Sequence, residues 1–186
     1  LVPSDAWSRR VRGHPWYGGE TISVGIGQGP ILATPLQLAV AYAALVNGGH
    51  RVTPHLTARN AKPPVPLGLE PEVLAAVRRG MELVVNGGSG TARRWGGLPA
   101  RFAGKTGTSQ VVRKVEGVRW YELPWEQRHH ALFVGYAPPE TPTLVVAVVV
   151  EHGGDASSVA APIAARLFQK AFAPDFDTST LRPVFP

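Results

Sequence analysis

Two segments near the C-terminal end of the chain constrain its fold most strongly. Residues 130–137 and 143–152 have the composition of strands, and only Pro138-Pro139-Glu140-Thr141-Pro142 separates them. A connection of this length fits an antiparallel hairpin. The second segment is rich in valine and apolar on both faces, so we expect it to be a central strand that is covered on both sides.

The residues that flank this hairpin predict a third strand and a covering helix. Residues 101–112 are strand-like, and a helix is expected to begin at Ser157 or Ser158. Helical spacing gives that helix one apolar face, which can cover the sheet. Its predicted members are Ala160, Ile163, Ala164, Leu167, Phe168 and Ala171.

The first half of the chain is predicted to be mainly helical after an irregular lead-in over residues 1–33. Pro35 fits a first helical position, and the segment from Leu36 to Val46 is apolar almost all round, so we expect a buried helix. Pro71 opens a second helix, which Asn86-Gly87-Gly88 ends. Its apolar residues at helical spacing are Val73, Val77, Met81, Val84 and Val85.

Helices followed by an antiparallel sheet with a C-terminal helix packed on it indicate an α+β fold rather than alternating βαβ units. We assign residues 1–172 to one incomplete domain and residues 173–186 to a polar tail that is draped on it or loose. The chain begins at Leu1 with neither Met nor a signal sequence, and we expect it to be a piece of a longer protein.

Composition excludes several classes of function. The chain has no cysteine, so disulfides, thiol catalysis and cysteine-ligated metal centres are excluded. The longest apolar run, residues 144–150, is far shorter than the roughly 20 residues that span a bilayer.

The net charge is +6, but the basic residues are scattered, and no nucleic-acid-binding motif is present. A solvated surface is the favoured interpretation of this charge, with an anionic partner as the alternative.

Two glycine-containing segments resemble nucleotide-binding loops but lack their defining residues. The run Gly25-Ile26-Gly27-Gln28-Gly29 is followed by Pro30, where the dinucleotide fingerprint requires glycine. Gly104-Lys105-Thr106 lacks the first glycine of a phosphate loop, because Pro99 occupies that position. Strand-like residues also follow it where a helix N-terminus is needed. We therefore predict no nucleotide and no cofactor.

The same segment has a better interpretation as the K-T-G element of penicillin-binding proteins and class A β-lactamases, Lys105-Thr106-Gly107. A lysine on a strand beside a cleft supplies positive charge for a carboxylate and for proton transfer, and Thr106 supplies a hydroxyl. Gly107 leaves room for a ligand beside the backbone. Thr108 then offers a backbone N–H for an oxyanion.

The surrounding residues resemble class B penicillin-binding proteins over about residues 1–172. Residues 103–110 resemble the extended third motif, and the elongation type, penicillin-binding protein 2, is the more similar of the two types. The other segments that carry the resemblance, in chain order, are Trp16-Tyr17-x-Gly19-Glu20-Thr21-Ile22-Ser23, Ile26-Gly27-Gln28-Gly29, Ala33-Thr34-Pro35-Leu36-Gln37-Leu38-Ala39, His130 to Pro138, and Ala160-Ala161-Pro162-Ile163-Ala164.

This resemblance implies part of a transpeptidase fold of the kind shared with serine β-lactamases, and a D,D-transpeptidase reaction. A serine attacks the D-Ala-D-Ala end of a peptidoglycan stem peptide, D-Ala leaves, and the amine of a neighbouring stem takes the acyl group; β-lactams acylate the same serine. It also implies an extracytoplasmic location on the bacterial inner membrane, anchored through an upstream region. A glycosyltransferase of cell elongation is the implied protein partner. Lys105, Thr106, Gly107 and Thr108 are the implied substrate-binding residues, with Lys105 and the Thr108 N–H in catalytic roles.

Two motifs of the family are missing. No serine in the chain has lysine three residues later, and none has asparagine two residues later, so S-x-x-K and S-x-N are both absent. We expect both upstream of Leu1, in the missing N-terminal half of the same protein, and we expect these 186 residues alone to be inactive. The resemblance makes Ser109 a strand residue beside the site and not the nucleophile.

Other residues keep two interpretations open. His130 is either structural or at the edge of the cleft. Trp120, Tyr121 and Trp125, in a loop over residues 115–127, form either a local cluster or a wall that contacts an acceptor strand or a partner. The histidines lack metal-ligand spacing, so no metal site is predicted. Two alternative functions remain: a β-lactam sensor or serine β-lactamase relative, and a non-catalytic scaffold.

Overall fold

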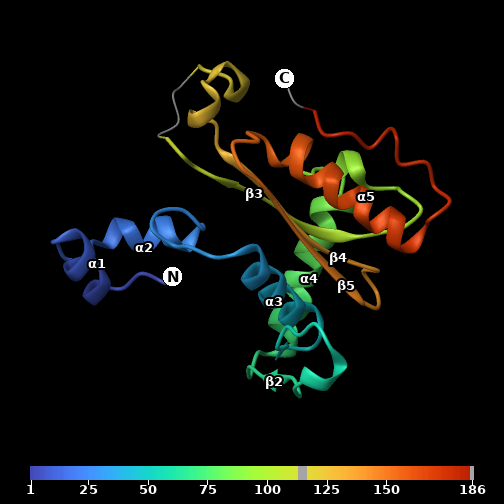
Figure 1. Ribbon diagram of the computed structural model, residues 1–186, viewed down its shortest axis with the longest axis horizontal. Helices are drawn as coiled ribbons and strands as arrows, with labels where there is room; N and C mark the ends of the chain where they lie inside the picture. The colour runs from blue at the N-terminus through green and yellow to red at the C-terminus, as the bar shows by residue number, and fades with distance from the viewer. Residues whose placement is uncertain (113–116, 185–186) are drawn as a thin grey trace. The chain divides into compact units, whose positions relative to one another are not determined.

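A computed structural model describes residues 1–112 and 117–184 (Figure 1). The chain forms two compact units, Leu1–Thr34 and Pro35–Pro186, which we describe separately. The predicted boundary at residue 172 is not tested by this division and stays a prediction. No helix in the described part of the chain is both long and apolar enough to cross a bilayer.

The first unit contains two short helices where an irregular segment was predicted, so that prediction is wrong. Helix α1 spans Asp5–Arg12 and helix α2 spans Gly18–Gly25. Local polar contacts define them. Ser4 caps α1 by accepting from the Trp7 N–H, and Asp5 accepts from Arg9 and from the Trp16 N–H. These contacts hold the pKa of the Asp5 carboxyl below its usual value.

The second unit is built on a three-stranded antiparallel sheet. Strands β3 (Ala103–Ser109), β4 (His130–Ala137) and β5 (Leu144–Val150) lie in the order β3-β4-β5. The predicted hairpin is confirmed, because β4 and β5 pair antiparallel from Ala131 opposite Val150 to Ala137 opposite Leu144. The predicted central position of the second hairpin strand is wrong for the described sheet, in which β4 is central and β5 lies at the edge.

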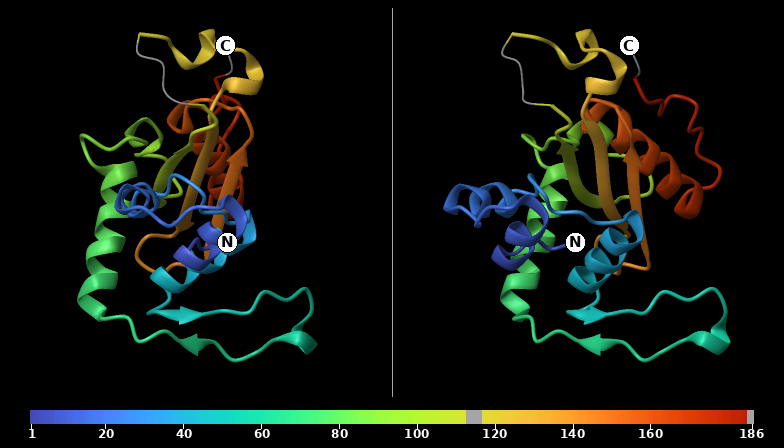
Figure 2. Two further views of the ribbon diagram at one scale, coloured as in Figure 1. Left: turned by 90° about the vertical axis from the view of Figure 1, so that its left-hand side faces the viewer. Right: turned by 60° about the vertical axis from the view of Figure 1, so that its left-hand side comes forward.

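Both faces of β5 are nevertheless apolar for a structural reason. Val148 belongs to the main core, which also contains Phe102, Phe133 and Phe168. Val145, on the opposite face, packs against a smaller cluster. Figure 2 shows α4 on one side of the sheet and α5 on the other. The valine run therefore reflects two covered faces rather than two neighbouring strands.

The C-terminal helix covers one face of the sheet, as predicted, and most of the predicted residues lie on that face. Ala160, Ala164 and Phe168 are buried in the main core and Ile163 packs against it, whereas Leu167 and Ala171 are exposed. A π-helical turn, Ala156–Ala160, leads into α5, Ala161–Phe172. The π-helical turn is capped by Asp155, so the helical segment begins at Ala156, slightly before the predicted start at Ser157 or Ser158. Leu167 is 48% exposed, whereas Gln169 is fully buried. The Gln169 side chain accepts from the Ala100 N–H at 3.0 Å and donates to the Ala100 carbonyl at 2.8 Å, which offsets the cost of burying an amide.

Helices α3 (Pro35–Val46) and α4 (Pro71–Asn86) match the predicted bounds and contribute to the second core cluster. The predicted burial of α3 holds in this chain only for Ala44 and Val46, and Leu36 is 59% exposed. The apolar face predicted for α4 is also partly wrong. Val73 and Val77 are exposed, and the buried residues are Leu74, Met81 and Val85.

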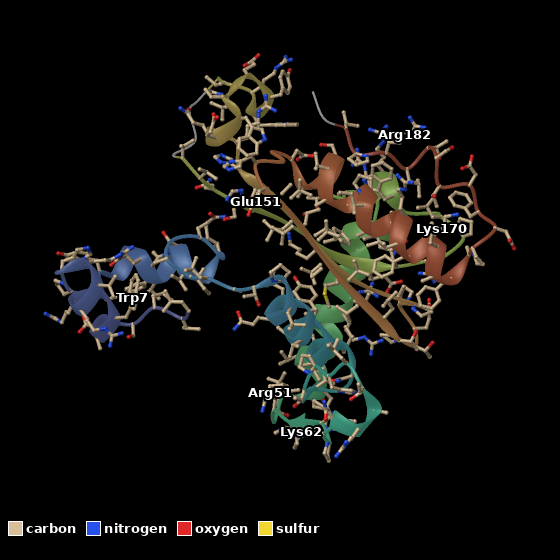
Figure 3. All side chains as sticks on the ribbon, viewed as in Figure 1. Trp7, Arg51, Lys62, Glu151, Lys170 and Arg182 are labelled. Carbon is tan, nitrogen blue, oxygen red and sulfur yellow. The ribbon has the colours of Figure 1, made fainter. Side chains whose placement is uncertain are left out.

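Short elements complete the unit. The segment between α3 and α4, which carries Arg51 and Lys62, contains an antiparallel pair of two-residue strands, β1 (His50–Arg51) and β2 (Val65–Pro66) (Figure 3). The tail lies on the domain as far as Val184, whose N–H donates to the Ser158 carbonyl, and Leu181 is buried in the main core. The 3₁₀ turns are Ala58–Asn60, Arg93–Trp95, Trp120–Glu122 and Trp125–Gln127.

Candidate functional site

The four predicted site residues line one hollow. Its volume is about 310 Å³, and three separate parts of the chain surround it: β3, the turn after α4, and the segment that leads into α5. The structure therefore brings Lys105, Thr106, Gly107 and Thr108 together with residues that the sequence did not single out. The full lining is Thr91, Lys105, Thr106, Gly107, Thr108, Asp155, Ala156 and Ser157.

Strand β3 is fixed by close packing at its start. Ala103 is fully buried, and Gly104 lies opposite Gly135 on β4. A Cβ at Gly104 would lie 2.5 Å from Phe133 Cζ and 2.6 Å from the Val134 carbonyl oxygen, so only glycine fits. Among the described strands β3 pairs with β4 alone, which leaves its other edge open along the hollow. A backbone edge of this kind presents hydrogen-bonding groups to an extended ligand.

The polar side chains of β3 make local contacts. Lys105 Nζ donates to the carbonyl of Thr106 at 2.8 Å. The hydroxyl of Thr106 lies 2.8 Å from the hydroxyl of Thr91, and either oxygen can be the donor. The ammonium and these hydroxyl donors make this wall of the hollow suited to an anion, above all a carboxylate.

The opposite wall is an ordered helix start. The Asp155 carboxylate accepts from the N–H and the hydroxyl of Ser158, both at 2.7 Å. The Trp95 indole N–H donates to the Ser157 carbonyl at 2.7 Å. Ser157 also lines the hollow, but Ala160 stands three residues later, where an S-x-x-K nucleophile requires lysine. No group of three His, Asp or Glu side chains suited to a metal ion occurs among the residues described here.

Comparison with known proteins decides the family. The model of the penicillin binding protein transpeptidase domain matches residues 4–169. The chain belongs to the penicillin-binding protein transpeptidase family. The predicted α+β transpeptidase fold and the predicted likeness to penicillin-binding protein 2 are confirmed by this match and by the relatives of the chain.

Three relatives illustrate the position of this transpeptidase-family chain. It is 41% identical to the peptidoglycan D,D-transpeptidase MrdA of Haemophilus influenzae, over 89% of the chain and 28% of the relative. The structure of penicillin-binding protein 2 in complex with MreC from Helicobacter pylori matches with a TM-score of 0.80 and 29% identity, over 95% of the chain and 32% of that chain. A chain of a peptidoglycan synthase complex, described as coordinating polymerization and crosslinking, matches with a TM-score of 0.72 and 35% identity. The match covers 95% of this chain and 29% of that chain.

The chain therefore spans less than a third of the length of the curated relatives that it matches.

Within this transpeptidase-family chain, Ser109 is the last residue of β3 and lies opposite His130 on β4. It does not line the hollow around Lys105.

His130 has its contacts within the protein. Its Nδ1 accepts from the His152 N–H at 2.9 Å, and the two rings meet edge to face with centroids 4.7 Å apart. It does not line the hollow around Lys105. These contacts favour the structural interpretation of His130 over a position at the cleft edge.

The aromatic residues between β3 and β4 form a local cluster. The Trp120 and Tyr121 rings are 5.8 Å apart, and the Trp125 ring lies 4.3 Å from that of His152. Trp120 covers Gly154, where a Cβ would lie 1.9 Å from the indole. This packing favours the local interpretation. Val115 and Glu116, at the start of the predicted loop, lie outside the described residues.

Sequence reasoning missed four lining residues, namely Thr91, Asp155, Ala156 and Ser157. For Asp155 a signal was available, because an aspartate three residues before Ser158 is a common helix cap. Thr91 has no comparable signal, since its role depends on a contact between residues that are fifteen positions apart.

Proposed function

We propose that the full-length protein containing these residues is a peptidoglycan D,D-transpeptidase of the elongation type, which cross-links stem peptides and binds β-lactams. One observation carries the proposal: the run from Lys105 to Thr108 lines a hollow on the open edge of β3, in a chain whose family model covers residues 4–169. The relatives named D,D-transpeptidase support the reaction.

Each residue of the run has a distinct role in the proposed reaction. Lys105 supplies positive charge and proton transfer, and Thr106 binds the carboxylate of the substrate or drug. The Thr108 N–H stabilises the oxyanion of the tetrahedral intermediate. Gly107 leaves clearance for a peptide that lies along the strand. We assign the nucleophile to an S-x-x-K serine and the second motif to S-x-N, both outside these 186 residues.

The location and partners follow from the same proposal. The active protein works at the extracytoplasmic face of the inner membrane, anchored through a region outside this chain. Its partner is an elongation glycosyltransferase, a pairing supported by the similarity to a chain of a peptidoglycan synthase complex. The exposed face of α3, with Leu36 and the neighbouring Val40 at an open apolar hollow of about 570 Å³, is assigned to contact with the rest of the same protein.

Labelled penicillin tests the proposal. We expect stoichiometric covalent labelling of the full-length protein and none of the 186-residue chain alone, measured by intact-mass spectrometry. Labelling of the short chain would contradict the assignment of the nucleophile. Rapid turnover of the drug, without transpeptidation of stem peptides, would support the β-lactamase or sensor alternative. Absence of labelling in both would favour a scaffold.

Two glycines on β3 are expected to have different roles, Gly104 in the stability of the fold and Gly107 in ligand binding. Gly104→Ala is expected to lower the free energy of unfolding by about 1–3 kcal/mol, because the new methyl overlaps Phe133 and the backbone of β4. At Gly107 an added Cβ would lie 3.4 Å from Leu132 Cβ, its one neighbour within 4 Å in the described part of the chain, which is a tight but tolerable contact. Gly107→Ala should therefore change stability by less than about 1 kcal/mol.

The same Gly107→Ala variant should nevertheless slow penicillin acylation at least about tenfold, because displacing a bound ligand by about 1 Å can cost about 100-fold in rate. Urea denaturation and acylation kinetics on both full-length variants measure the two effects. Equal acylation by Gly107→Ala and the unmodified protein would show that Gly107 provides no clearance.

A further inference from the structure

We propose that Thr91 is a positioning residue for Thr106: its hydroxyl donates a hydrogen bond to the Thr106 oxygen and thereby directs the Thr106 proton towards the ligand carboxylate. The inference rests on the proposed function, which assigns Thr106 to carboxylate binding. Its basis is the distance of 2.8 Å between the two hydroxyl oxygens, at the edge of the hollow that both residues line.

The direction of this hydrogen bond follows from the chemistry of the groups. A hydroxyl has one proton to donate and two lone pairs with which to accept. A carboxylate can only accept, so Thr106 must give its single proton to the ligand. The Thr106 oxygen is then the acceptor in the contact with Thr91, and Thr91 is the donor. Two consecutive bonds in one direction polarise each other, which strengthens the outer bond to the carboxylate.

The protein framework holds Thr91 in place. The next residue, Ala92, is fully buried, and its N–H donates to the Val84 carbonyl of α4 at 2.9 Å. At the end of α4, the Asn86 side-chain amide donates to the Phe102 carbonyl at 3.0 Å, directly before β3. The turn that carries Thr91 and the strand that carries Thr106 are therefore both tied to α4. This arrangement sets the hydroxyl contact before any ligand arrives.

Substitution of Thr91 by valine tests the inference, because valine keeps the branched shape and removes the donor. In the full-length protein, Thr91→Val should raise the dissociation constant of the initial, noncovalent penicillin complex about fivefold to tenfold, the size expected for one hydrogen bond. The first-order acylation rate at saturating penicillin should change less than about twofold, because Thr91 does not contact the reacting atoms. Thr91→Ser, which restores the donor, should bind penicillin like the unmodified protein.

A double-mutant cycle distinguishes positioning from general support of the structure. In a Thr106→Val background, Thr91→Val should have no further effect on penicillin binding, because the group that it positions is gone. Stopped-flow acylation kinetics over a range of penicillin concentrations give both constants, and thermal unfolding shows whether each variant is folded. Additive effects of the two substitutions, or a Thr91→Ser variant as weak as Thr91→Val, would overturn the inference.

The outcomes for the two proposals are separate. If the unmodified full-length protein is acylated while Thr91→Val binds penicillin with unchanged affinity, the role of Thr91 is wrong and the transpeptidase assignment stands. If the unmodified full-length protein is not acylated, the assignment fails and the role of Thr91 fails with it.

Discussion

Replacing Lys105 by methionine in the full-length protein is expected to lower the second-order rate constant of penicillin acylation about 100-fold or more, the range of a positioned proton-transfer group. Methionine keeps the unbranched stem and removes the ammonium. In the structure, Lys105 Nζ donates to the Thr106 carbonyl and the residue lines the hollow with Thr106 and Thr108. No group in the described lining can replace its positive charge.

A second lysine provides the matched control. Lys170 is exposed on α5, where its ammonium donates to the Pro174 carbonyl at 3.5 Å and acts electrostatically on Asp177. Lys170→Met removes the same charge from the protein but leaves the hollow unchanged, so acylation should remain within about twofold of the unmodified rate, and burst labelling with a fluorescent penicillin measures both variants. Equal acylation by Lys105→Met and Lys170→Met would refute the role of Lys105.

The second large effect is expected in the core behind the site. Phe102→Ala should lower the free energy of unfolding by about 3–5 kcal/mol, because it leaves a cavity at a buried aromatic position. Phe102 is 1% exposed. Its ring stacks on Phe168 with centroids 5.1 Å apart and meets Phe133 edge to face at 6.1 Å. The substitution therefore removes the ring that packs between Phe168 on α5 and Phe133 on the sheet, at the residue that immediately precedes β3.

Leu167 offers a control on the same helix. The sequence places Leu167 on the apolar face, but its side chain is 48% exposed, so Leu167→Ala should cost less than about 1 kcal/mol. Urea-induced unfolding followed by tryptophan fluorescence compares the two variants. A loss from Leu167→Ala as large as that from Phe102→Ala would indicate that the Leu167 side chain is buried, as its spacing predicts.

Much of the fold could be predicted because local signals determine it. Pro71 and the Asn86-Gly87-Gly88 run define α4, and the short Pro-rich turn defines the hairpin of β4 and β5. Which side chains are buried was harder to predict, since burial depends on neighbours distant in sequence. Leu167 and Gln169 show this most clearly: the apolar residue is exposed, while the amide is buried because the backbone of Ala100 satisfies it.

The candidate site likewise has one part that could be predicted from the sequence and another that could not. A contiguous run on one strand, Lys105 to Thr108, could be recognised as a motif. The other walls come from Thr91 and from Asp155 to Ser157, and only the folded chain shows that they face this run. The lead-in helices were missed for a related reason, since caps and ion pairs such as that of Asp5 with Arg9 define them and each helix carries only a few apolar residues.

The indole of Trp95 has a consequence for the thermodynamics of ligand binding. It is buried in the core one turn beyond Thr91, and it donates to the carbonyl of Ser157 on the facing wall. One side chain therefore holds both sides of the hollow at a set separation. The polar groups of the two walls are therefore already in place when a ligand binds, and the protein loses little conformational entropy. The binding free energy then comes mainly from the contacts between ligand and protein.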